Sequence, residues 1–162
     1  MNWSELMYNK EILKKELLNL LSGKNAHATF EKAVADFPVK YINEKVEGIN
    51  NTAWELVEHM RIAQWDILDF INNPEYKMKE FPAGYWPKEK TATSEMWNES
   101  IQKFENDFSE FVKIINNPQT DFFSPIPHVK NYTIYREILV VSNHNSYHTG
   151  QLILMRKILG IW

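Results

Sequence analysis

The 162-residue sequence contains no cysteine. This absence excludes disulfide bonds, thiolate metal ligands and a cysteine nucleophile, so any thiol chemistry requires a thiol from outside the chain. Runs of lysine and arginine are also missing, and the formal net charge is −3. Nucleic acid is therefore not an expected partner. The longest aliphatic runs are four residues, for example Ile138 to Val141, and the charged N-terminus lacks an apolar signal segment. We expect a cytoplasmic protein with no membrane partner.

Apolar residues recur at helical spacing in four long stretches, and no stretch shows the alternation of a strand. Helices are expected over residues 3–21, 52–71, 93–116 and 133–159. Thr52, with Glu55 three residues later, has the pattern of a capping box at the start of the second helix. Gly160 supplies a stop after the last one. The length and composition predict one all-α domain covering residues 1–162.

The connecting segments are long for a helical bundle. About 30, 22 and 17 residues join the successive helices, whereas a simple up-down-up-down bundle needs only short links. At least one long crossover is therefore expected. The first connector is predicted to contain a short helix over residues 26–37, capped by Asn25 and ended by Pro38. The second contains the aromatic loop FPAGYWP at residues 81–87, which is expected to roof a pocket.

Two histidines, His144 and His148, lie four residues apart on an otherwise apolar stripe of the last predicted helix. Side chains at this spacing lie one above the other, about 5–6 Å apart at Cβ, so both rings can offer a nitrogen to one ion. His59 occupies the matching stripe of the second predicted helix. If the two stripes face each other, three imidazoles converge inside the protein. Such a cluster predicts a metal site, because buried imidazoles otherwise need other polar partners.

The histidine spacing alone is a weak indicator, since a histidine on an apolar stripe is more often a hydrogen-bonded core residue than a ligand. Three imidazoles suit a divalent transition metal, Zn or Ni before Fe or Mn, and leave a position open for water or substrate. Two alternatives stay open. One is a closed, non-catalytic structural site with a fourth ligand from His27 or Asp66. In the other, the histidines hold no metal.

Several polar residues near the histidines are candidates for orienting the rings, because a metal-bound histidine generally gives its other N–H to such a group. The candidates are Glu55, Asn145, Tyr147 and Gln151. For Glu55, capping is the competing prediction. Glu58 and Asp66 are expected to be solvated charges, His27 to be exposed, and His128 to lie in a loop.

The segments that carry these histidines resemble a known family. Residues 53–59, AWELVEH, and residues 144–152, HNSYHTGQL, are similar to the DinB-like (DinB/YfiT) superfamily of metal-dependent enzymes. The likeness covers nearly the whole chain. It implies a four-helix bundle of up-down-down-up topology with long crossover connections, often assembled as a homodimer. It also implies that His59, His144 and His148 are the metal ligands.

Characterised members of that superfamily include thiol-dependent S-transferases and isomerases that use bacillithiol, mycothiol or glutathione. The resemblance therefore implies a small-molecule substrate and a low-molecular-weight thiol as partners. The expected function is that of a thiol-dependent S-transferase acting on electrophilic small molecules, in which the metal lowers the pKa of the thiol. A metal-dependent hydrolase is the alternative enzyme, because the same open position can bind water.

Overall fold

The computed structural model describes residues 3–162, with side chains described from Tyr8 onward. The chain is mostly helical, and the four long helices expected from the sequence are confirmed. The elements in chain order are α1 (Trp3–Ser22), α2 (Phe30–Val34), the single turn η1 (Val39–Tyr41), α3 (Ala53–Asn72), η2 (Ala83–Tyr85), α4 (Ser94–Asn116), β1 (Pro125–Ile126), β2 (Val129–Thr133) and α5 (Ile134–Ile158). Within residues 3–162, no helix combines the length and the apolar character needed to cross a membrane.

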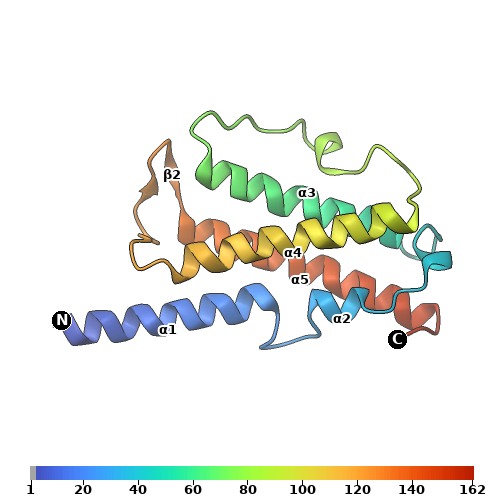
Figure 1. The fold of residues 1–162 in the computed structure, drawn as a ribbon, viewed down its shortest axis with the longest axis horizontal. Helices are drawn as coiled ribbons and strands as arrows, with labels where there is room; N and C mark the ends of the chain where they lie inside the picture. Colours follow the sequence, from blue (N-terminus) through green and yellow to red (C-terminus); the bar gives the residue numbers. More distant parts are fainter. Residues whose placement is uncertain (1–2) are drawn as a thin grey trace.

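The long helices pack side by side. The α3 helix contacts both α4 and α5, and α1 contacts α5 and α4. Figure 1 shows α1 and α5 running in one direction and α3 and α4 in the other. Because α3 and α4 are parallel, the segment between them returns along the outside of the helices, over the full length of α3 (Figure 1). This returning segment contains η2, which contacts α3.

The short helix expected over residues 26–37 is wrong in its bounds, because α2 covers only Phe30–Val34. Its N-cap is Thr29, whose hydroxyl accepts a hydrogen bond from the backbone N–H of Lys32, and not Asn25. Thr and Asn are both good N-caps, so the sequence offers two competing starts. The helix ends early because Asp36 adopts a left-handed φ of 51° just before Pro38.

A two-stranded antiparallel hairpin, β1 with β2, was not expected from the sequence. The first strand begins at Pro125 and ends before Pro127, so it is only two residues long and shows no alternation. Ile126 is 3% exposed and belongs to the same core cluster as Ile138 of α5. The second strand leads directly into α5, whose N-cap Thr133 accepts a hydrogen bond from the N–H of Arg136.

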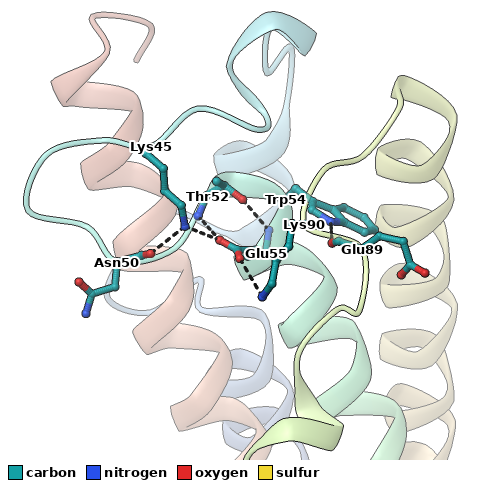
Figure 2. Close-up of polar contacts among 7 residues, drawn as sticks. All are labelled: Lys45, Asn50, Thr52, Trp54, Glu55, Glu89 and Lys90. Carbon is teal, nitrogen blue, oxygen red and sulfur yellow. Dashed lines mark hydrogen bonds and ion pairs between the residues drawn. The ribbon is translucent and has the colours of Figure 1, made fainter.

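The predicted capping box at the start of α3 is confirmed. The Thr52 hydroxyl accepts from the Glu55 N–H at 3.1 Å, and the Glu55 carboxylate accepts from the Thr52 N–H at 2.9 Å. Figure 2 shows that Lys45 and Lys90 approach the same carboxylate from two different loops, at 2.8 and 3.5 Å. The indole of Trp54, beside it, donates to the carbonyl of Glu89. Glu55 therefore joins both flanking loops to the first turn of α3.

We expect Glu55→Gln to lower the free energy of unfolding by about 1 kcal/mol at neutral pH. Burial raises the pKa of Glu55, but the hydrogen bonds from Lys45 and the Thr52 N–H outweigh it, so the pKa lies below its ordinary value of 4.5. As pH falls, Glu55 is therefore protonated at a higher pH in the unfolded chain than in the folded protein. The advantage of the native protein over the variant is complete above about pH 4.5 and disappears as pH falls through the lowered pKa.

Urea denaturation at a series of pH values measures this difference. Glu110→Gln is the matched control, because its ion pair with Lys113 is exposed on both sides. A difference between native protein and Glu55→Gln that stayed constant down to the acid limit would contradict the assigned ion pairs.

A buried amide pair joins α3 to its two neighbours. Asn145 of α5 donates from Nδ2 to Oε1 of Gln64 at 2.8 Å, and Gln64 donates from Nε2 to the Phe104 carbonyl of α4 at 2.7 Å. Gln64 is fully buried and Asn145 is 6% exposed. Along α3 the pair lies between Met60 and Leu68, which belong to different core clusters. This polar layer fixes how far α3 slides along α5, because a shifted register leaves buried amide groups unpaired.

Replacing Gln64 with methionine, a side chain of similar length, is expected to lower the free energy of unfolding by about 1–3 kcal/mol. The variant leaves the Asn145 amide and the Phe104 carbonyl without their buried partner. Chemical denaturation measures the change, with the exposed Gln102→Met on α4 as control. Equal stability of the two variants would show that the amide pair does not constrain the helices.

Candidate metal centre

The structure brings His59, His144 and His148 together between α3 and α5. One ring nitrogen from each residue lies within 4.8 Å of the other two, and no other group of three or more His, Asp or Glu side chains in the described part of the chain is arranged in this way. His59 and His148 are 8% and 7% exposed, whereas His144 is partly exposed. The expectation that the two helical stripes face each other is confirmed.

Hydrogen bonds to Nδ1 fix the orientation of two of the rings. His59 Nδ1 lies 2.7 Å from the Tyr85 carbonyl, and His148 Nδ1 lies 2.7 Å from Oε1 of Gln151. Both partners are acceptors, so each Nδ1 carries the proton and donates it. Each Nε2 is then left with its lone pair. This arrangement, with one nitrogen donating to a carbonyl and the other free, is typical of a metal-bound histidine.

The third ring of the cluster is that of His144. His144 Nε2 is 2.9 Å from His59 Nε2, and its Nδ1 is 3.5 Å from Oδ1 of Asn145. Because His59 Nε2 carries a lone pair, a neutral His144 donates its Nε2 proton to it, and a bound metal ion would take the place of that proton. Burial, reinforced by the neighbouring His148 and His59, lowers the pKa of His144 to about 4. Burial also lowers the pKa of His59 and of His148.

Neutral imidazole is the form that binds a metal, because a proton competes for the same lone pair. The lowered pKa values therefore keep all three rings ready for a metal ion at neutral pH. Three imidazole donors without any carboxylate fit a divalent transition metal rather than Mg²⁺ or Ca²⁺, which prefer oxygen. With three protein ligands, such an ion retains at least one position for another molecule.

A cavity of about 690 Å³ leads to the histidines. His59, His144 and His148 line it, together with the aromatic loop expected to roof a pocket, which contributes Phe81, Pro82, Tyr85 and Trp86. That expectation is confirmed. The indole of Trp86 stacks on the His59 ring, with centroids 4.0 Å apart and planes 7° from parallel. The loop therefore covers the cavity and holds one of the three rings in place.

The candidate orienting residues take different positions. Gln151 contacts His148, and Asn145 is near His144. The Tyr147 ring packs edge-on against His148, and its hydroxyl accepts a hydrogen bond from Gln151 at 3.4 Å. Glu55, by contrast, has its contacts at the start of α3, as the capping prediction requires.

The residues considered for a fourth ligand lie outside the cluster. His27 is exposed, as expected, and its Nε2 contacts the Ser146 hydroxyl at 2.9 Å. Asp66 accepts hydrogen bonds from two tyrosine hydroxyls. The expectation that Asp66 is a solvated charge is wrong, because it is only 6% exposed. Glu58 is also partly buried, where it pairs with Arg61 and Ser100.

Sequence reasoning missed three contributors to the site. They are the Tyr85 carbonyl, the Trp86 ring over His59, and Gln64 in the polar layer between the helices. A polar Gln64 next to Ala63 on a buried helix was a usable indication, since such residues are hydrogen-bonded when buried. The sequence does not indicate which backbone carbonyl accepts a hydrogen bond from His59, because every residue carries one.

Comparison of the chain with protein-family models, with curated proteins and with solved structures found no match.

Proposed function

We propose that this protein is a metal-dependent enzyme in which His59, His144 and His148 hold a divalent transition metal. The observation that carries the proposal is the convergence of three imidazole nitrogens, two of them from buried rings, at the wall of a large cavity. A purely structural site is closed by four protein ligands, whereas catalytic sites keep a position open. His27 and Asp66, the two residues considered for a fourth ligand, have other partners.

The reaction proposed for this site is thiol-dependent S-transfer to an electrophilic small molecule. A second cavity of about 390 Å³ shares Trp86, Tyr147 and His148 with the first one. Its remaining wall contains Asn50, Asn51 and Gln151, so it is richer in amide groups than the aromatic cavity. Two cavities that meet at one histidine can hold two different molecules, which a transfer reaction requires. Hydrolysis needs only one organic substrate and is the alternative.

The fold proposed for this chain is that of the DinB-like superfamily, a four-helix bundle of up-down-down-up topology. It is supported by the resemblance of residues 53–59 and 144–152 and by the helix directions in Figure 1. The α2 helix and the hairpin are additions to the four long helices. A homodimer is part of the same proposal, as is a low-molecular-weight thiol as the second substrate.

When bound, a divalent metal lowers the pKa of a coordinated thiol or water and thereby supplies the nucleophile. The residues of the chain orient the three histidines and shape the cavity beside them. Tyr85 and Gln151 keep the lone pairs of His59 and His148 directed at one point. Trp86 stacks on the His59 ring and, with the loop around it, lines the cavity beside the histidines. In the transfer, the thiol sulfur bonds to the electrophilic carbon, the leaving group departs with the bonding electrons, and the thiol proton is released.

Tyr147 is the residue placed to assist the departing group. Its side chain borders both cavities, and its hydroxyl oxygen accepts from Gln151. The O–H of Tyr147 is then free to donate to a departing group.

Protein purified without an affinity tag is expected to contain about one transition-metal ion per chain. Replacing any one of the three histidines with alanine should weaken metal binding by more than about a hundredfold, beyond the effect of an orienting residue. Elemental analysis and calorimetric titration measure this. His128→Ala is the control, because that ring contacts the Phe70 carbonyl outside the cluster. Absence of stoichiometric metal, with His144→Ala behaving like the control, would refute the metal centre.

The transferase proposal predicts turnover that consumes a thiol. Metal-loaded protein is incubated with glutathione or bacillithiol and with chlorodinitrobenzene, and the loss of free thiol is measured together with thioether formation. His144→Ala should abolish the reaction, while His128→Ala should retain it. Hydrolysis of an activated ester without thiol consumption would instead support the hydrolase and contradict the transferase.

A further inference from the structure

A buried carboxylate, Asp66, lies on the wall of the aromatic cavity away from the histidine cluster. It is 6% exposed. Its Oδ2 accepts hydrogen bonds from the hydroxyls of Tyr76 at 3.0 Å and Tyr85 at 2.8 Å. Its Oδ1 is buried and has no hydrogen-bond partner. Since buried carboxylates are nearly always paired, Asp66 has one position for a donor that the described chain does not fill.

The charges around the cavity do not compensate this carboxylate. None of the ion pairs in the described part of the chain includes Asp66. The cavity wall also contains Glu137, which is 3% exposed, and Arg136, whose guanidinium is 2.6 Å from the Glu137 carboxylate. Arg136 therefore already pairs with Glu137, and no basic side chain of the cavity wall is left for Asp66. The remaining negative charge favours a cationic ligand.

Aromatic rings surround the carboxylate on the same wall. Phe70 and Tyr76 pack edge to face with centroids 5.1 Å apart, and both line the cavity beside Asp66. Tyr85 approaches Asp66 from the covering loop. Aromatic faces next to a carboxylate are the usual environment for an ammonium group, which gains from the ring electrons as well as from the negative charge.

The hydrogen-bond pattern selects among cations. A guanidinium prefers both oxygens of a carboxylate, but Oδ2 already accepts from two hydroxyls. A quaternary ammonium has no N–H with which to satisfy Oδ1. A primary ammonium is a compact charge with three donors, and it can use the one free oxygen.

We propose that Asp66, Tyr76 and Tyr85 form a binding subsite for a protonated primary amine on the cavity ligand. Asp66 lies seven residues from His59 on α3, which corresponds to about 10 Å along the helix axis. The ligand is therefore an elongated molecule, with its amine at Asp66 and its reactive end toward the histidines. The amine subsite itself does not require the metal. Only the identity of the reactive end rests on the proposed function.

The test compares molecules of one shape with the 162-residue chain in the presence of a chelator. Phenylbutylamine and phenylbutanol differ only in the terminal group, and binding is measured by calorimetry or NMR titration. The amine is expected to bind about tenfold or more tightly than the alcohol, because a hydrogen bond between charged groups replaces a neutral one. The trimethylated amine should lose most of this advantage. Equal affinity of amine and alcohol, or of the primary and trimethylated amines, would overturn the subsite.

Asp66→Asn removes the charge while keeping the side-chain shape, and it should abolish the preference for the amine. Asp69→Asn is the matched control on the same helix, since Asp69 contacts Asn73 and does not line the cavity. An amine preference that persists in Asp66→Asn would overturn the proposal. If Asp66→Asn fails to fold, the comparison of ligands on the native chain decides the question alone.

Metal-loaded protein extends the test to the whole cavity. A series of ω-aminoalkanethiols of increasing length is compared with alkanethiols of the same length. An affinity maximum at one chain length, lost in Asp66→Asn and in His144→Ala, supports a ligand that bridges both ends. Amine preference without any effect of the metal or of His144→Ala retains the subsite and rejects the proposed thiol function. Thiol binding without amine preference rejects the subsite alone.

Discussion

The hydrogen bond from Asn145 to Gln64 is the constraint on which the candidate metal centre depends. It joins α5 to α3 in a layer where both side chains are buried, and Gln64 continues it to the backbone of α4. A core made only of leucine and isoleucine tolerates small shifts of one helix along another, because apolar contacts are not directional. The amide pair does not tolerate them. It therefore sets which residues of α3 face His144 and His148, and His59 is one of them.

Holding three imidazoles between α3 and α5 has a free-energy cost. Burial of the rings disfavours protonation, as the lowered pKa of His144 reflects. Two Nδ1 protons have hydrogen-bond acceptors in the rest of the protein, whereas the Nε2 atoms of His59 and His144 have only each other as partners. A site arranged only for stability would satisfy the inner nitrogens and leave the outer ones in water. In this protein the outer nitrogens of His59 and His148 are paired with the chain, and the inner nitrogens gather where a metal ion could bind them.

The parts of the fold that follow from side-chain periodicity were predictable. The long helices have apolar stripes, and α3, α4 and α5 begin after the capping threonines Thr52, Thr93 and Thr133, as expected. The short elements were not predictable in the same way. The α2 helix has two candidate caps within five residues, and the choice between them depends on how the preceding turn packs. The β1 strand is too short to carry a pattern and is stabilised by burying Ile126 in the core.

The metal ligands were predictable for the same reason as the helices, since they occupy stripe positions. Their orienting partners were predictable only when they lay on the same helix, as Gln151 does. The partner of His59 is a carbonyl 26 residues away, in a loop whose path no local pattern specifies. The burial of Asp66 has the same origin. On an isolated α3 this residue would face water. The segment that connects α3 to the parallel α4 runs along the outside of α3 and places Tyr76 and Tyr85 against Asp66. The long crossover thus both covers the cavity and turns an ordinary helix-surface carboxylate into a buried one.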